Sequence, residues 1–253
     1  MINTYTETSK IRGIRASCKI ASKVMKLITQ EIKFGVTTLY LDSVAEKAMS
    51  DFGVRSAFRG YRGFPGSICI SVNEEIVHGI PSESKIISQG DMVKIDMGVI
   101  LNGYYSDMAT TILIDDGSEN SVANRHLMDA NLSALMAGIS AARPKSIVAA
   151  ISSAIYKVLQ DKGYEPIDDL CGHGVGIHLH EPPAIPNKIE GWNCSPVLKS
   201  GMTIAIEPMV ALGTSKARIA NDGWTLVTDN GKSASHFEHT ILITDGEPEI
   251  LTL

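Results

Sequence analysis

The sequence has no long apolar run, and no stretch of it is rich in proline, glycine or serine. Its apolar stretches are too short to cross a bilayer, so we expect no association with a membrane. Without a linker-like segment, residues 1–253 are predicted to form one domain. A formal net charge of −5 gives no support to nucleic-acid binding.

Signal-peptide and disulfide patterns are also missing. Residues 1–19 lack an apolar signal-peptide core, which predicts a cytoplasmic protein. Cys18, Cys69, Cys171 and Cys194 show neither close pairing nor zinc-finger spacing, which favours reduced thiols. Cys171 is interpreted as a small buried residue, because a nucleophile would need an adjacent base that spacing alone does not show.

Apolar periodicity predicts an order of two helices followed by strands, and this order occurs twice. The first set has helices over residues 8–33 and 39–52 and strands over 67–73, 91–101 and 107–114. The second has helices over 121–142 and 146–159, the latter capped by Ser146, and strands over 202–210, 223–228 and 236–244. This order indicates a duplication over about 8–115 and about 121–250. Two such halves predict an α+β fold with a shared antiparallel sheet and helices outside.

Four acidic residues occur in two matched sequence environments. Asp96 and Glu207 each follow a glycine by six residues within an apolar strand pattern, and each is followed by a second acid, Asp107 or Glu238. A single acid of this kind is more often a solvated or salt-bridged surface residue. Two acids embedded in apolar strands, however, would be costly to bury without a cation. The pattern therefore favours four carboxylates around one metal-binding cavity.

Three histidines complete this candidate site. His173 lies between two glycines and is a candidate metal ligand. Four carboxylates and one imidazole suit two divalent cations, and Mn(II), Fe(II) or Co(II) is favoured over a thiolate-type zinc site. His78 and His180 each precede a proline-containing turn, once per half, and could donate hydrogen bonds to a substrate. Their alternative interpretation is as ordinary loop histidines.

Six short motifs then carry a resemblance over essentially the whole chain. These are HGIP, CGHGVG, LHEPP, IEPM, DGWT and FEHT, in this order and spacing. The set resembles type I methionine aminopeptidases of the pita-bread fold. The resemblance implies a cytoplasmic enzyme, a monomer with transient ribosome contact, that removes the initiator methionine from nascent polypeptides.

The resemblance also implies roles for the ligands. Asp96 would chelate one divalent ion, and His173 with Glu207 would bind the other. Asp107 and Glu238 would bridge both ions, with Zn(II) compatible besides the three metals above. Glu207 would also transfer a proton from the attacking water to the leaving amine.

The remaining implied roles concern the substrate. His78 and His180 would position the scissile peptide and stabilise its developing charge. An apolar pocket would hold the methionine side chain, and the positions that match the family's pocket are Phe58, Tyr61, Phe64, Cys69, Leu179 and Trp224. Without the resemblance, such an aromatic cluster would be interpreted as core.

Three positions depart from the family pattern. Phe58 stands where many bacterial members have cysteine, Leu179 where some have an aromatic residue, and His236 where many have glutamine. None of these changes removes a candidate metal ligand. The departures at Phe58 and Leu179 are expected to reshape the rim of the pocket.

The sequence disfavours three alternative functions. An Xaa-Pro aminopeptidase or prolidase on the same fold usually carries an extra N-terminal domain, for which the early helices leave no room. A non-catalytic binding protein on this fold typically loses ligands, whereas all five are present here. A type II methionine aminopeptidase carries a helical insertion between motifs that lie close together in this chain.

Overall fold

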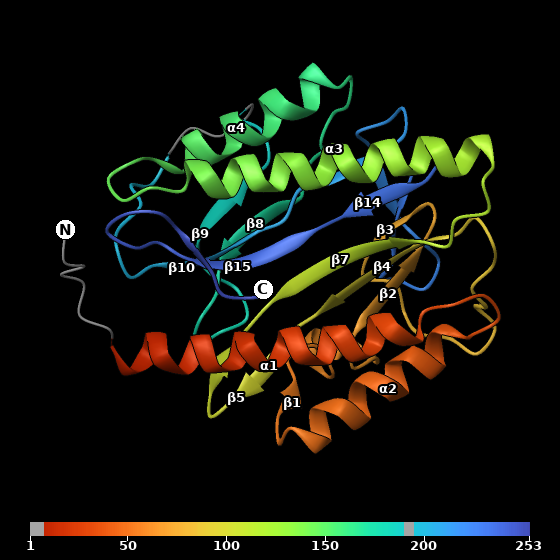
Figure 1. Cartoon of the computed structure of the whole chain (residues 1–253), viewed down its shortest axis with the longest axis horizontal. Coiled ribbons are helices and arrows are strands. Elements are labelled where there is room, and N and C mark those ends of the chain that lie inside the picture. The colour runs from red at the N-terminus through yellow and green to blue at the C-terminus, as the bar shows by residue number, and fades with distance from the viewer. Residues whose placement is uncertain (1–7, 190–194) are drawn as a thin grey trace.

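The computed structural model describes residues 8–189 and 195–253, and it is built around one long, curved antiparallel sheet (Figure 1). Cys194 and the first seven residues of the N-terminal segment lie outside the described residues. Within the described ranges, no helix combines the length and apolar character needed to cross a bilayer. Cys18, Cys69 and Cys171 are free thiols, which confirms the prediction for these three.

Two helix pairs flank the sheet. Figure 1 shows α1 and α2 along one side and α3 and α4 along the other, with the long strands between them. Threonine or serine side chains cap the first three helices: Thr8, Thr37 and Ser118 each accept a hydrogen bond from the backbone three residues later. The helices are α1 (Ser9–Glu31), α2 (Thr38–Asp51), α3 (Glu119–Ala141) and α4 (Val148–Asp161).

The main sheet of the described residues has eight strands in the order β2-β4-β7-β15-β10-β8-β9, with β16 also paired to β15. Reading from the first strand to the last, these are β2 (Cys69–Val72), β4 (Met92–Met97), β7 (Met108–Leu113), β15 (Glu238–Leu242), β10 (Thr203–Ile206), β8 (Cys171–Gly174), β9 (Glu181–Pro186) and β16 (Glu249–Ile250). Its centre is the β7–β15 pair, which joins strands from the two predicted repeats.

Smaller elements extend from this sheet. A short 3₁₀ turn, η1 (Tyr61–Gly63), follows β1. Three small sheets are formed by β1 (Arg55–Ser56) with β5 (Val99–Leu101) and β6 (Tyr104–Tyr105), by β11 (Met209–Ala211) with β14 (Ala234–His236), and by β12 (Ala217–Ile219) with β13 (Leu226–Thr228) and β3 (Glu75–Val77).

Alternation along the strands separates the core from the polar face. On β4, Val93, Ile95 and Met97 pack into the core with α1 and α2, so Asp96 projects to the opposite face. On β10, the isoleucines at 204 and 206 pack with α3 and α4 in the same way, and Glu207 follows directly. Each helix pair therefore buries one half of the sheet and leaves the polar positions on the other face.

The structure corrects the predicted start of α4. Ile147, not Ser146, is the N-cap residue, and its side chain makes no capping hydrogen bond. The Ser146 hydroxyl instead donates to the carbonyl of Arg143, 2.8 Å away. The first amides of α4 donate to another segment, with Ala149 N 2.7 Å from the hydroxyl of Ser195. A distant segment thus supplies the cap, which local sequence could not indicate.

Two strands around the candidate site were not predicted. His173 was expected on a glycine loop, but it lies within β8, whose glycines let neighbouring backbone approach closely. A Cβ on Gly172 would lie 2.2 Å from the carbonyl oxygen of Ala205. The prolines after His180 were expected in a turn, but they form β9, the last strand in the sheet order. An edge strand tolerates prolines because their missing N–H groups need no partner.

Replacing Asp42 with alanine should destabilise the protein. This buried side chain on α2 accepts hydrogen bonds from the amides of Ser67 and Ile68, at 2.8 and 3.0 Å, immediately before β2. Losing the acceptor leaves both buried amides unpaired, so we expect the free energy of unfolding to fall by about 2 kcal/mol. Urea denaturation measures this change.

The matched control is Asp51→Ala, at the exposed end of the same helix, where Asp51 forms a surface ion pair with Lys47. That change should cost about 0.5 kcal/mol or less. Equal losses in the two variants would contradict the role assigned to Asp42.

Candidate metal centre and substrate cavity

Five adjacent strands of the main sheet bring the five predicted ligands together. In sheet order, Asp96 lies on β4, Asp107 directly precedes β7, Glu238 begins β15, Glu207 directly follows β10 and His173 lies on β8. Asp96, Asp107, His173 and Glu238 are each at most 9% exposed. Residues separated by up to 142 positions in the chain therefore converge on one buried polar group.

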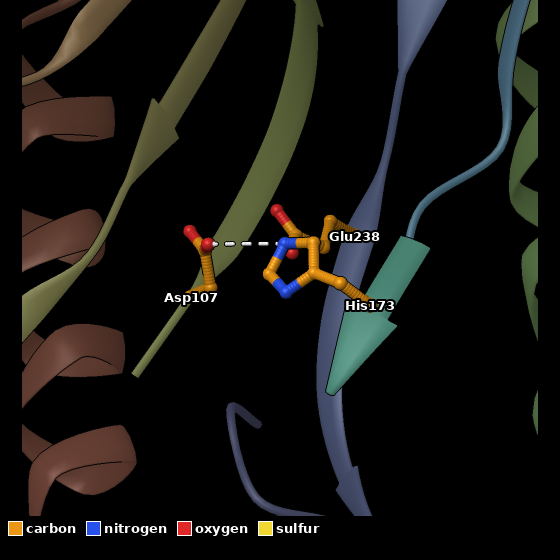
Figure 2. Close-up of side chains that lie close together, drawn as sticks. All are labelled: Asp107, His173 and Glu238. Carbon is orange, nitrogen blue, oxygen red and sulfur yellow. Dashed lines mark ion pairs between the residues drawn. The ribbon is translucent and has the colours of Figure 1, made fainter. Parts of the chain in front are cut away.

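The ligand atoms are within reach of one another. Figure 2 shows Asp107, His173 and Glu238 pointing toward a common point, and their ligand atoms all lie within 4.8 Å of one another. His173 Nε2 lies 3.6 Å from Asp107 Oδ2 and 3.4 Å from Glu207 Oε1. The other ring nitrogen, Nδ1, is 2.9 Å from the carbonyl oxygen of Gly174. If Nδ1 donates to that carbonyl, the lone pair of Nε2 faces the acids, as a metal ligand requires.

Thr240 fixes the backbone that presents Asp107. Its hydroxyl accepts a hydrogen bond from the amide of Asp107 at 3.2 Å and donates to the carbonyl of Asp107 at 2.7 Å. One hydroxyl can do both because it has one donor and two acceptor sites. Since Thr240 is on β15, this clamp also fixes Asp107 relative to Glu238.

The electrostatics of the group favour a cation. Burial raises the pKa of Asp96 and of Glu207 to about 7, and it raises the pKa of Asp107 and of Glu238 well above the usual range, with further increases from the neighbouring acids. Oδ1 of Asp107 and Oε1 of Glu238 are buried and have no hydrogen-bond partner among the described residues. Burial lowers the pKa of His173, which keeps its ring neutral. Unpaired carboxylate oxygens beside a neutral imidazole fit a divalent cation.

A cavity of about 560 Å³ opens onto this group. Its apolar wall includes Phe64 and Trp224, whose rings meet edge to face with centroids 5.3 Å apart. Cys69 on β2 and Asp96 on β4 form a cross-strand pair, so the apolar wall and the polar group are adjacent in the sheet. The predicted pocket residues all line this cavity: Phe58, Tyr61, Phe64, Cys69, Leu179 and Trp224.

His78 and His180 also line the cavity. The ring of His180 lies 4.2 Å from that of His173, and its Nδ1 lies 2.9 Å from the hydroxyl of Tyr61. Burial lowers the pKa of His180, and Arg62 and His78 lower it further. Desolvation by the surrounding protein lowers the pKa of His78, and the charge of His236 lowers it further. His78 has a φ of 60°, a conformation that is uncommon outside glycine and that occurs often at active sites.

Several further residues line the cavity although their sequence patterns did not predict it. Val77 and Met209 contribute apolar surface, and Arg62 and Asp169 contribute opposite charges. Met209 could have been found, since it ends the IEPM motif only two residues after Glu207. Cys171 was expected to be buried, but it is only partly buried and lines the cavity. Burial and Glu207 raise the pKa of its thiol, so it is not an activated nucleophile.

Comparisons with known proteins agree with this geometry. Residues 12–245 match the model of metallopeptidase family M24. A methionine aminopeptidase from Aquifex aeolicus is 38% identical over 99% of this chain and 98% of its own length. The crystal structure of a methionine aminopeptidase from Thermotoga maritima superposes with a TM-score of 0.92 at 35% identity, covering 99% of both chains. A prolidase from Pyrococcus furiosus gives a TM-score of 0.78 at 26% identity, covering all of this chain but 66% of its own.

A divalent cation should stabilise the protein more at about pH 7.5 than at about pH 5.5. In the metal-free fold, Asp96 and Glu207 keep protons up to a pKa of about 7, whereas in the unfolded chain they lose them near pH 4. These raised pKa values favour the metal-free fold at low pH, and that contribution is lost as the pH rises through about 7. A cation must displace the protons of Asp96 and Glu207 only below that pH. Each displacement weakens cation binding by about 1.4 kcal/mol per pH unit.

The measurement is the increase in Tm on adding Mn(II) at the two pH values. The Asp96→Asn variant lacks one titrating carboxyl and should show a smaller difference between them. Equal increases at both pH values for the parent protein would contradict the prediction.

Proposed function

Because the chain belongs to metallopeptidase family M24, we infer that it is a methionine aminopeptidase, which removes the N-terminal methionine from polypeptides. Its fold is the α+β pita-bread fold expected from the sequence. The observation that carries this function is the convergence of four carboxylates and one imidazole beside an apolar cavity. The prolidase alternative is less favoured, since the prolidase match leaves about a third of that enzyme uncovered.

We propose that the polar group binds two divalent cations. Asp96 would hold one, His173 and Glu207 would hold the other, and Asp107 and Glu238 would bridge them. Support comes from the short distances around His173 and from the unpaired oxygens of Asp107 and Glu238. The oxygen-rich donor set favours Fe(II), Mn(II) or Co(II), with Zn(II) compatible. Such ions lower the pKa of bound water and make it a nucleophile at neutral pH.

Glu207 is the proposed proton carrier. Its carboxylate lies at the junction between the polar group and the cavity, with Oε1 3.4 Å from His173. A carboxylate at this junction can accept a proton from the attacking water and deliver it to the leaving amine. Hydrolysis of the peptide bond requires both transfers, and one group in this position serves for each.

His180 is the proposed donor to the developing negative charge on the scissile carbonyl oxygen. Its lowered pKa keeps the ring neutral, so only one ring nitrogen carries a proton. If the hydroxyl of Tyr61 donates to Nδ1, that proton resides on Nε2 and can be donated to substrate. Tyr61 would then set the tautomer of His180, in addition to lining the pocket. His78 would contact the same peptide from the other half of the chain.

The apolar cavity wall is the proposed methionine pocket. The rings of Phe64 and Trp224 meet edge to face, and Phe58, Cys69 and Leu179 pack in the same buried cluster. An unbranched thioether side chain adapts well to such a surface. The separation between this wall and the polar group would hold the first peptide bond near Glu207.

Further proposals concern the whole protein. We propose that residues 1–253 form one catalytic domain with pseudo-repeats over about 8–115 and about 121–250. The matching order of strands on either side of the β7–β15 pair supports this division. We also propose that the protein acts as a cytoplasmic monomer on nascent chains, with transient contact to the ribosome.

The substrate test compares peptides. Purified protein titrated with Mn(II), Co(II) or Fe(II) should release methionine from Met-Ala-Ser and should cleave Ala-Pro or Phe-Pro poorly. Cleavage of only the proline peptides would overturn the proposed function.

Replacing Glu238 with glutamine should lower kcat at least about 100-fold, because it removes a bridging charge from a buried site. The exposed Glu247→Gln variant is the control and should keep the parent rate.

A second test addresses Tyr61. Tyr61→Phe keeps the ring but removes the hydroxyl that contacts His180, so kcat should fall about tenfold with little change in KM. The control is Tyr105→Phe, since Tyr105 packs against the same cluster and its hydroxyl has no hydrogen-bond partner among the described residues. Steady-state rates on Met-Ala-Ser measure both. Equal rates for Tyr61→Phe and the parent would exclude the tautomer role.

A further inference from the structure

His236 lies directly behind the polar group on a rigid segment of backbone. It ends β14, two residues before Glu238, and its side chain is 1% exposed. The hydroxyl of Thr111 on β7 accepts from its amide at 3.0 Å and donates to its carbonyl at 2.6 Å. The preceding residue, Ser235, is held from α3 by the side-chain amide of Asn131. The imidazole is therefore presented from a backbone fixed on two sides.

The ring of His236 is buried beside charged groups. Neither ring nitrogen has a hydrogen-bond partner among the described residues, although both are buried. Its Nε2 lies 3.6 Å from Oε2 of Glu207, and Asp96, Lys94 and His78 lie in its electrostatic environment. A neutral imidazole keeps one N–H, and burying that N–H without a partner is costly. The carboxylate of Glu207, 3.6 Å from Nε2, is an acceptor that can satisfy this N–H.

The two oxygens of Glu207 face different imidazoles. Oε1 lies 3.4 Å from Nε2 of His173, on the cavity side, whereas Oε2 lies 3.6 Å from Nε2 of His236. A donor on the Oε2 side would stop the carboxylate from rotating about its last side-chain bond. Partners behind a ligand that fix its orientation typically change metal affinity 10- to 100-fold when they are removed.

We propose that His236 is a positioning residue for Glu207. Nε2 and Oε2 are 3.6 Å apart, and a small approach lets Nε2–H donate a hydrogen bond to Oε2 and hold Oε1 toward the metal ions and the substrate. His236 acts through Glu207 and is not itself a ligand. This inference rests on the proposed function, because it assigns the support of the residue proposed to bind metal and carry the proton.

Three variants at this position separate positioning from packing. His236→Gln keeps a neutral N–H donor of similar reach, His236→Asn keeps the donor but shortens it by one methylene, and His236→Leu fills the space without a donor. The affinity for Co(II) is measured by calorimetry in the absence of peptide, and the absorption bands of bound Co(II) report its geometry. Thermal unfolding of each metal-free variant measures folding, and kcat and KM are measured on Met-Ala-Ser.

A positioning role predicts a clear pattern. Leucine and asparagine should each weaken Co(II) binding about 10- to 100-fold, shift its absorption bands and lower kcat more than they change KM. Glutamine should restore affinity and kcat to within a few-fold of the parent. If the leucine variant does not fold, Co(II) affinity and kcat of the asparagine and glutamine variants still test the positioning role.

Two outcomes would overturn the proposal. One is parent-like Co(II) affinity and kcat in both the leucine and the asparagine variants. The other is a loss of thermal stability that is equal in all three variants and accompanied by unchanged Co(II) spectra, which would make His236 a packing residue only. Failure of the proposed function is a separate result: the parent would then not cleave Met-Ala-Ser, whereas the Co(II) measurements would still report on His236.

Discussion

Four carboxylates buried at the centre of an apolar sheet are the constraint on which the rest of this structure depends. Neighbouring acids raise the pKa of Asp107 and of Glu238, and both side chains have a buried oxygen without a hydrogen-bond partner among the described residues. Such a group is unfavourable on its own and becomes favourable when cations are bound. The helix pairs, the strand order and the clamp from Thr240 all hold these charges at short range despite their repulsion.

Three histidines of the site have the same kind of environment. Each proposed role needs a neutral imidazole with a defined tautomer, and in each case a fixed neighbour faces one ring nitrogen. For His173 the neighbour is a backbone carbonyl, for His180 it is the hydroxyl of Tyr61, and for His236 it is a carboxylate. Burial or crowding lowers the pKa of all three rings, which keeps them neutral at physiological pH. Neutral rings with fixed protons suit a ligand and hydrogen-bond donors.

The sequence predicted the helices and most strands, and it singled out the four acids that the structure brings together, because those signals are local and repeated. Asp96 and Glu207 stand in matching apolar strands, and alternation alone directs both away from the helices. The sequence did not predict β8 and β9, because β8 is rich in glycine and β9 in proline, and both residues are uncommon in strands. Both strands form through pairing with their neighbours in the sheet. The cap of α4 by Ser195 and the contact between His236 and Glu207 depend on distant chain segments, so no window of sequence contains them.

The convergence of five neighbouring strands has a consequence for how the protein matures. The proposed ligands begin at Asp96 in the first half of the chain and end at Glu238, near the C-terminal strands. Its middle strand, β15, is therefore among the last to leave the ribosome, and it must insert between β7 and β10, which were made earlier. Until Glu238 has been made, the chain therefore lacks one of the five residues of the proposed metal site. The aminopeptidase is then expected to stay inactive until its own synthesis is nearly finished.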